Sequence, residues 1–331
     1  MKCSRLQSLL QLFFTDRLLK QLGVSPHTVA AYRDAFRLLL QFAAERLRRQ
    51  PSELRIEDLD APFLSKFLDH LEEVRGNCTR TRNNRLAAFH AFFHYVSVSE
   101  PALALHCQRV LAIPAKRHER APVSFLTEEE SAALVAAPRL DTWIGRRDRA
   151  LLLVAVQTGL RNSELTSLRR QDVEFGVGAH VRCFGKGRKM RYTPLRPEVA
   201  SVLKQWLSRQ AGKPEDLVFP NSNGGRMSAD ALQRLVAKHV ATARQTCPSL
   251  HDKTVTPHTL RHGTAMALLQ HGVDISVIAL WLGHESSDTT QIYLHADMRL
   301  KEKALAHASP SKAVPDRFKP TDSLLAFLEG L

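Results

Sequence analysis

Six side chains in the second half of the chain have the types and spacing that phosphoryl chemistry would use. They are Arg161, Lys186, His258, Arg261, His284 and Tyr293. Two guanidinium groups suit the non-bridging oxygens of a phosphodiester, where negative charge grows in a pentacoordinate transition state. A tyrosine can attack phosphorus and keep the energy of the broken bond in a phosphotyrosyl ester, so that rejoining needs no ATP. A lysine could protonate the leaving 5′-oxygen, and a histidine could exchange the phenol proton.

Each of these residues also has an ordinary structural explanation. A single histidine is more often a hydrogen-bonded core residue than a catalytic one, an arginine can cap a carbonyl, and Tyr293 could simply pack. The case for a site is that polar groups interrupt short apolar helical patterns between Thr256 and Tyr293. We assign Trp281 and Leu282 to the core. We set aside three other histidines, His262, His271 and His295.

No metal and no other cofactor is expected. The sequence shows no acidic triplet of the kind that two-metal phosphoryl transfer needs. The segment HESS after Gly283 has no second histidine at helical spacing, and the five cysteines form no CxxC pair. These patterns indicate a reducing cytosol and no structural zinc.

Three short helices are expected to position the C-terminal part of the site. Thr256 can cap a helix that begins at a proline and that Gly272 ends. The apolar run ISVIALWL predicts a second helix, ended by Gly283. A third helix should begin near Ser287, with Tyr293 on it or just after it.

Arg161 and Lys186 are expected at a helix junction and in the turn of a hairpin, respectively. Gly159 should end one helix and the segment from Leu160 should begin the next, so that Arg161 projects from a rigid junction. The segment AHVRCFGKGRKMRYTPL predicts two short strands with Lys186 in the turn. A lysine between two glycines is also typical of an ordinary exposed turn.

The N-terminal part of the chain, residues 1–105, has the apolar spacing of an all-helical domain. Arg80, Arg82 and Arg85 crowd the expected start of one of its helices, where backbone N–H groups and side-chain charge could converge on a phosphate. The alternative is a solvated basic face.

The rest of the chain divides by its composition. Residues 106–122 are basic and flanked by prolines, which indicates a linker. A capping box from Thr127 to Glu130 opens the first helix of a second domain, residues 123–306. Residues 307–331 read as a proline-rich tether followed by a short amphipathic helix that should dock elsewhere.

The overall charge indicates a polyanionic partner. The 331 residues carry 47 Lys and Arg against 33 Asp and Glu, a formal charge of +14. Charge alone is weak evidence, because basic proteins also bind acidic membranes. However, no run of 18 apolar residues exists, and Asp16 interrupts the apolar N-terminal patch. We therefore expect a polyanionic partner, and a cytoplasmic protein that does not bind a membrane.

Four segments resemble the motifs of the tyrosine recombinases, or phage integrase family, and in particular their Xer-like bacterial branch. In chain order they are TGLRNSEL, GKGRKMRYTPL, HTLRH and LGHESSDTTQIY, within a similarity that covers roughly residues 10–306. The resemblance implies that the six residues named first form the full catalytic set. It also implies that Glu164 orients Arg161.

The resemblance further implies a mainly α fold with a small β-sheet. An all-helical, SAM-like core-binding domain and a mixed α/β catalytic domain would clamp double-stranded DNA, the implied partner, from opposite faces. The implied activity is cleavage of DNA through a 3′-phosphotyrosine and strand exchange through a Holliday junction. The implied assembly is a homotetramer on two sites or a hetero-assembly with a related recombinase, associated with a bacterial nucleoid, with the C-terminal helix contacting a neighbouring protomer.

Two other functions stay open at this stage. A type IB topoisomerase would use the same chemistry but would relax supercoils as a monomer. A DNA-binding regulator or accessory subunit would keep the fold and not cut DNA. Among recombinases, the sequence leaves open an enzyme of a mobile element and an enzyme of an Xer-like resolution system.

Overall fold

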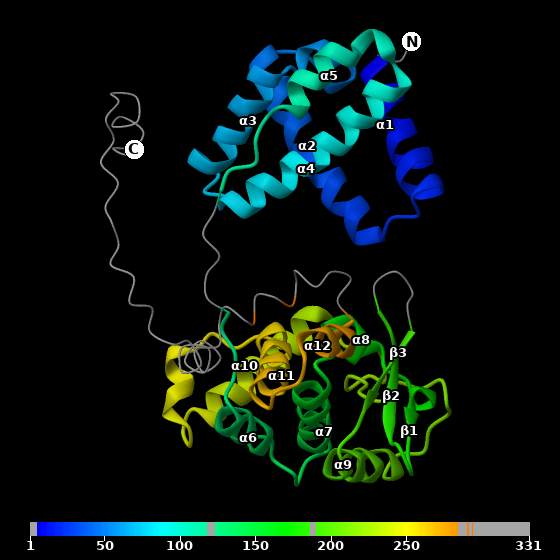
Figure 1. Ribbon diagram of the computed structural model, residues 1–331, viewed down its shortest axis with the longest axis vertical. Coiled ribbons are helices and arrows are strands. Elements are labelled where there is room, and N and C mark those ends of the chain that lie inside the picture. Colours follow the sequence, from blue (N-terminus) through cyan, green and yellow to red (C-terminus); the bar gives the residue numbers. More distant parts are fainter. Residues whose placement is uncertain (1–4, 118–122, 186–189, 284–289, 291–292, 294–331) are drawn as a thin grey trace, which may run out of the picture. The chain divides into compact units, whose positions relative to one another are not determined.

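The computed structural model describes residues 5–117, 123–185, 190–283, 290 and 293. The chain divides into two units, Met1–Ala121 and Pro122–Leu331, and each is described by itself (Figure 1). The expected tether and C-terminal helix, most of the expected third helix, Lys186 and His284 lie outside the described residues. Among the described residues no helix is both long and apolar enough to cross a membrane.

The first unit is entirely helical in the part that the structure describes. Its α-helices are α1 (Arg5–Leu12), α2 (Pro26–Leu47), α3 (Ala61–Glu73), α4 (Thr79–Ser99) and α5 (Ala104–Leu111), with a π-helix η1 (Phe13–Gln21) after α1. Short 3₁₀ turns are η2 (Pro51–Glu53), η3 (Ile56–Asp58) and η4 (Pro101–Leu103). The Ser25 hydroxyl caps α2 and the Asp60 carboxylate caps α3, each by accepting a backbone N–H bond. Phe36 packs edge-to-face on Phe89 and Phe92 in the core.

The expected linker, residues 106–122, begins inside a helix of the first unit. Residues 104–111 form α5, whose Cys107 and Val110 are buried against the core of the first unit. The segment has no side-chain cap and buries only Cys107 and Val110 of its eight residues, so the sequence alone did not reveal a helix. Packing on α4 supplies the stability that local propensity does not.

The second unit places helices around a small sheet. Its first elements are α6 (Glu128–Ala136), α7 (Trp143–Thr158), α8 (Asn162–Ser167), η5 (Arg170–Asp172), β1 (Val173–Glu174), β2 (His180–Phe184) and β3 (Met190–Pro194). Its later elements are α9 (Pro197–Ser208), α10 (Ala229–Ala243), η7 (Pro248–Asp252), α11 (Pro257–Gln270) and α12 (Ile275–Leu282). The predicted capping box is present: Thr127 accepts from Glu130 N, and the Glu130 carboxylate accepts from Thr127 N.

The sheet has the antiparallel order β1-β2-β3, and the predicted hairpin is confirmed. Val181 opposes Thr193, and both are fully buried, while Phe184 and Met190 pair at the exposed end beside the turn. Strand alternation therefore directs one face of the hairpin into the core of the unit. The short third strand β1 was not evident from the sequence.

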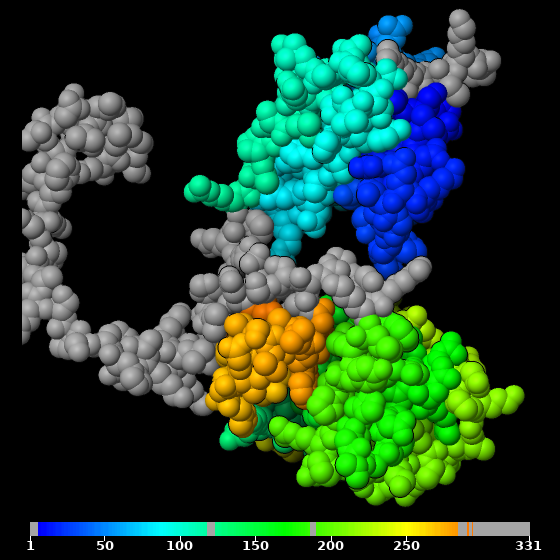
Figure 2. Space-filling view, turned by 45° about the vertical axis from the view of Figure 1, so that its right-hand side comes forward, coloured from blue at the N-terminus to red at the C-terminus, as the bar shows by residue number. Residues whose placement is uncertain are grey.

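Four elements of this unit meet at the candidate site. Helix α11 packs on α7, and α12 lies beside β3, as Figure 1 shows. In Figure 2 the segment of α11 and α12, in orange, lies beside the green segments of the same unit. The helices with one small sheet confirm the predicted mainly α fold class.

Candidate active site

Arg161 lies at the junction between α7 and α8, as predicted. Gly159 ends α7 in the left-handed conformation with φ of +62°, and Arg161 is the residue that precedes α8. The backbone N–H of Arg161 donates to Glu164 Oε2 at 2.7 Å, and its Nη1 donates to Glu164 Oε1 at 3.0 Å. Its Nη2 donates to the carbonyl of Gly283 at 2.6 Å. The two side-chain bonds fix the guanidinium while part of it stays exposed to solvent.

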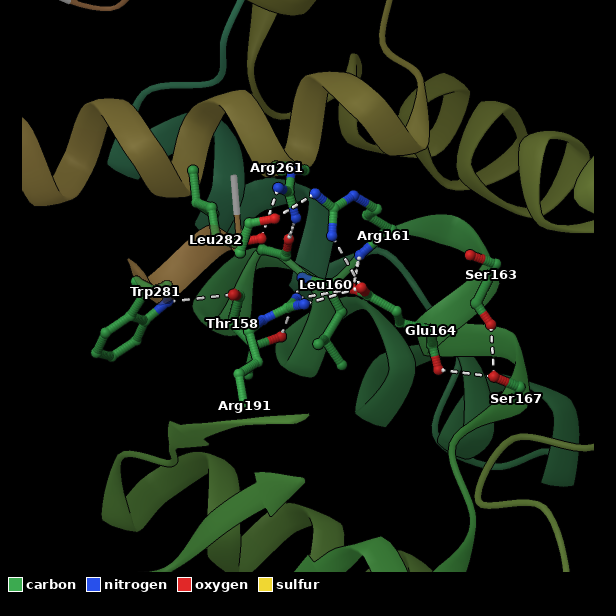
Figure 3. Close-up of polar contacts among 12 residues, drawn as sticks. Thr158, Leu160, Arg161, Ser163, Glu164, Ser167, Arg191, Arg261, Trp281 and Leu282 are labelled. Atoms are coloured by element: carbon green, nitrogen blue, oxygen red, sulfur yellow. Dashed lines mark hydrogen bonds and ion pairs between the residues drawn. The ribbon is translucent and has the colours of Figure 1, made fainter. Parts of the chain in front are cut away.

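Arg261 is held as firmly and is almost completely buried. Its Nη1 donates to the Gly159 carbonyl and its Nη2 to the Leu282 carbonyl, each at 2.7 Å (Figure 3). Burial and then the nearby charge of Arg161 lower the pKa of Arg261 to about 10, against the opposing effect of Glu164. The guanidinium therefore stays charged at neutral pH, and the two arginines form a cationic pair.

Two helix C-termini compensate this pair of cations. The carbonyls that accept the arginine bonds belong to Gly159 at the end of α7 and to Leu282 and Gly283 at the end of α12. The C-terminal end of a helix carries unpaired carbonyls and the negative end of its dipole, both of which favour a cation. The fold therefore holds two positive charges close together, and among the described residues the guanidinium of Arg261 donates to backbone carbonyls rather than to a carboxylate.

Glu164 joins Arg161 to a third arginine that the sequence reasoning missed. Arg191 of β3 makes a two-pronged ion pair with Glu164, with bonds of 2.8 and 2.7 Å (Figure 3). Burial tends to raise the pKa of Glu164, but the Arg191 bonds and charge outweigh it and lower that pKa. The only sequence signal was an arginine on the inward face of the hairpin, opposite Cys183, where an apolar residue was expected.

His258 lies in the first turn of α11 at the rim of a small polar cavity. The cavity has a volume of about 170 Å³ and is lined by Leu160, Arg161, Asn162, Gln233, Thr256, Pro257 and His258. Partial desolvation, then the charges of Arg261 and Arg161, lower the pKa of His258. An anion in this cavity would meet a guanidinium and an imidazole.

Tyr293 is buried within the electrostatic range of Arg261. Only 1% of the residue is exposed, and it packs in a cluster with Ala265, Met266, Leu269, Ile278 and Leu282. Burial raises the pKa of Tyr293 to about 12, although the positive charge of Arg261 lowers it in part. The phenol is therefore neutral in this state of the protein.

His262, which we had set aside, contacts this phenol. Its Nδ1 lies 2.9 Å from Tyr293 Oη, and the two rings meet edge-to-face with centroids 5.6 Å apart. Burial, then His258 and Arg261, lower the pKa of His262 to about 4. No local pattern separates His262 from the other histidines that we set aside, because its partner Tyr293 lies 31 positions along the chain.

The structure thus brings together four of the six predicted catalytic residues. Arg161, His258, Arg261 and Tyr293 lie in one cluster, in which Arg261 acts electrostatically on both His258 and Tyr293. The positions of Lys186 and His284 are outside the described residues. Within the described part of the chain no group of three His, Cys, Asp or Glu side chains could hold a metal ion.

The three basic residues predicted to contact DNA in the first unit have different environments. Arg80 is exposed in the first turn of α4, and Arg85 is half-buried with a pKa lowered by desolvation and then by Arg75. Arg82, in contrast, is only 4% exposed. Its Nη1 donates to the Pro114 carbonyl at 3.0 Å and to Asn83 Oδ1 at 3.1 Å. The expectation of a phosphate contact is therefore wrong for Arg82, whose guanidinium ties the segment after α5 to α4.

Two family models match the chain. The model of the phage integrase family matches residues 124–299, and the model of the phage integrase N-terminal SAM-like domain matches residues 12–97. Fold and site therefore define a DNA strand-exchange enzyme with a helical N-terminal unit. The chain belongs to the phage integrase family of tyrosine recombinases.

Relatives agree with this assignment, and solved structures share the fold. The chain is 52% identical to a candidate integrase/recombinase named y4rC from Sinorhizobium fredii, over 100% of this chain and 99% of that protein. It is 33% identical to the tyrosine recombinase XerD of Pseudomonas putida, over 89% of this chain and 95% of that protein. A crystal structure of the XerH recombinase bound to palindromic difH substrate has a TM-score of 0.69 and 23% identity, covering 84% of this chain and 79% of that chain. The Tn1549 transposon integrase with circular intermediate DNA has a TM-score of 0.68 and 19% identity, covering 90% of this chain and 99% of that chain.

Proposed function

We propose that this protein is a site-specific recombinase that cuts and rejoins double-stranded DNA through a 3′-phosphotyrosyl intermediate on Tyr293. The observation that carries the proposal is the pair of fixed guanidiniums, Arg161 and Arg261, of which Arg261 acts electrostatically on the buried phenol of Tyr293. The reaction needs no ATP, because the ester itself conserves the energy of the broken bond. The two guanidiniums, rather than metal ions, stabilise the charge on the phosphate oxygens.

In the first step the scissile phosphodiester binds between the two arginines. Arg161 and Arg261 donate to its non-bridging oxygens and gain strength as charge grows on them in the transition state. Their carbonyl and carboxylate partners already fix both side chains, so little reorganisation is needed during the reaction.

In the chemical step Tyr293 Oη attacks phosphorus while the bond from phosphorus to the 5′-oxygen breaks. Lys186 protonates the leaving 5′-oxygen, and His258 or His284 exchanges the phenol proton. Rejoining is the reverse reaction with a 5′-hydroxyl of the partner strand. The attack requires Tyr293 to move from its buried position, because a phenol with a pKa raised to about 12 is protonated and shielded.

The assembly that we propose is a tetramer of this chain on two DNA sites, or a mixed assembly with a related recombinase. The exposed Arg80 and the half-buried Arg85 of the first unit would contact phosphates, and the C-terminal segment would contact a neighbouring protomer. The solved structures that share this fold include a recombinase bound to difH and a transposon integrase bound to circular intermediate DNA. They support a DNA substrate that belongs to a resolution system or to a mobile element.

A covalent trap tests the proposal. Nicked suicide duplexes made from DNA that flanks the gene lose a short fragment after cleavage, so that the phosphotyrosyl adduct cannot rejoin. On a denaturing gel, wild type should form an adduct and Tyr293→Phe should form none while keeping its affinity for the duplex. Tyr192→Phe is the matched control, because Tyr192 is exposed on β3, and it should form the adduct at the wild-type rate.

Three outcomes would contradict the proposal. An adduct with Tyr293→Phe would move the nucleophile to another residue. Failure of wild type to form an adduct on duplexes that it binds would favour the DNA-binding regulator that does not cut. Relaxation of supercoiled plasmid by a monomer would favour the topoisomerase.

A further inference from the structure

Arg191 has no part in the mechanism above, although it is bonded to the carboxylate that holds Arg161. It is the second residue of β3, opposite Cys183, and its side chain is 10% exposed. Burial tends to lower the pKa of Arg191, but the bonds and charge of Glu164 outweigh it and raise that pKa. A charged guanidinium is therefore buried in the fold and joined to Arg161 through Glu164.

Four hydrogen bonds from described residues fill the carboxylate of Glu164. A carboxylate offers about four lone-pair positions, two on each oxygen. Arg191 takes one position on each oxygen, with bonds of 2.8 and 2.7 Å (Figure 3). The other two accept the backbone N–H of Arg161 at 2.7 Å and its Nη1 at 3.0 Å. The Arg161 guanidinium therefore makes a single bond to this carboxylate, whereas arginine and carboxylate frequently form a two-pronged pair.

Arg191 also packs on the second group that holds Arg161. The Nη2 of Arg161 donates to the carbonyl of Gly283 at 2.6 Å. A Cβ at Gly283 would lie 2.9 Å from Arg191 Nη1, so the arginine lies directly against this glycine. Arg191 thus contacts both partners of the Arg161 guanidinium, which itself lines the polar cavity with His258.

Removing Arg191 would change the geometry and the charge of Arg161 together. Both oxygens of Glu164 would become open to the Arg161 guanidinium, and a two-pronged pair would turn it away from the cavity. The buried carboxylate would then offset the charge of Arg161 alone, whereas now it is shared by two arginines. A phosphate in the cavity would meet a weaker positive charge.

We propose that Arg191 is a positioning residue for Arg161, which keeps the Arg161 guanidinium and its charge available to the scissile phosphate by occupying Glu164. This inference rests on the proposed function. Arg191 acts only through Glu164 and Gly283, because its own side chain is buried.

Variants of Arg191 should lose cleavage and keep binding. Arg191→Met removes the charge and both bonds, and adduct formation should slow about 100-fold with unchanged affinity for the suicide duplex. Arg191→Lys keeps the charge but cannot form the two-pronged pair, and it should slow about 10-fold. Arg182→Met is the matched control on the adjacent strand β2, because Arg182 pairs with Asp172 at 3.2 Å and not with Glu164. It should form the adduct at the wild-type rate.

A methylphosphonate at the scissile position separates an effect on Arg161 from a loss of structure. In each of its two stereoisomers a methyl group replaces one non-bridging oxygen, so an arginine that serves this oxygen no longer contributes. Arg161→Ala identifies the isomer that lacks the oxygen served by Arg161, since its defect relative to wild type shrinks on that isomer. The defect of Arg191→Met should shrink at least 10-fold on the same isomer.

The outcomes distinguish this inference from the proposed function. A wild-type rate for Arg191→Met overturns the inference, as does a defect that is equal on the phosphate and on both isomers or is relieved on a different isomer from that of Arg161→Ala. If Arg191→Met does not fold, as judged by its Tm, Arg191→Lys takes its place, and a wild-type rate for it overturns the inference. Absence of any wild-type adduct on the phosphate duplex refutes the proposed function and is recognised by that result alone.

Discussion

At the scale of single residues, the site depends on one carboxylate shared by two arginines. Glu164 is buried and accepts side-chain bonds from Arg161 and Arg191, so its charge offsets theirs in a region that excludes water. Removing one member of a buried ion pair typically costs about 3–5 kcal/mol, because it leaves an uncompensated charge. Glu164 is therefore both a stabilising residue and the link from the β2–β3 hairpin to Arg161.

Glu164→Gln should lower the free energy of unfolding by about 3 kcal/mol at pH 7. The folded pKa of Glu164 lies below its ordinary value of 4.5, so its contribution is fully present above pH 4.5 and is lost as the pH falls through the folded pKa. Urea unfolding at pH 7 and below pH 4.5 measures the free energy of unfolding of both proteins. The difference in this free energy between wild type and variant should be smaller in acid. An equal difference at both pH values would mean that the carboxylate charge does not stabilise the fold.

At the scale of elements, two helix ends position the cationic pair. Gly283 ends α12 with φ of +66°, and a Cβ there would lie 2.9 Å from Arg191 Nη1. Gly272 follows α11 with φ of +80°, but a Cβ there would meet nothing within 4 Å. The two glycines thus share the backbone requirement and differ in their surroundings.

Gly283→Ala should slow adduct formation at least 10-fold, because the added methyl group displaces an arginine that Glu164 holds in place. Gly272→Ala should lower stability by about 1 kcal/mol through its left-handed backbone alone and leave the adduct rate unchanged. Adduct rates and Tm values of both variants measure this. Equal adduct rates would mean that the close packing at the end of α12 does not affect the site.

Local signals made most of these elements predictable. Ser, Thr and Asp caps and the ending glycines are visible in the sequence, and α7, α11 and α12 begin and end where those residues indicate. Helix α5 was missed because its stability comes from burial of Cys107 and Val110 on the rest of the unit. A tertiary contact of that kind leaves little local pattern.

The site was predictable only in part. Arg161, His258, Arg261 and Tyr293 stand within recognisable motifs, and the structure gathers them. Arg191 and His262 were missed because their partners, Glu164 and Tyr293, are distant in the sequence. The burial of Arg82 was missed for the same reason, since it depends on a carbonyl 32 residues away.

At the scale of the whole molecule, the formal charge of +14 should make DNA binding strongly dependent on salt. The logarithm of the binding constant should fall linearly with the logarithm of the salt concentration, and fluorescence anisotropy with the flanking duplex measures the slope. Arg80→Ala should reduce the slope by about 1, because Arg80 is exposed and is proposed to release one counterion. Arg82→Ala should keep the slope and lower the Tm, since Arg82 bonds the Pro114 carbonyl. A flat salt response would contradict a polyanionic partner.

The most direct test of the central claim is to identify the amino acid that carries the DNA. Wild-type adduct from the suicide duplex is digested with nuclease and protease, and the peptide that retains a nucleotide is sequenced by mass spectrometry. The account predicts a nucleotide joined through its 3′-phosphate to Tyr293. A nucleotide on Tyr192 or on any other residue, or attached through a 5′-phosphate, would contradict it.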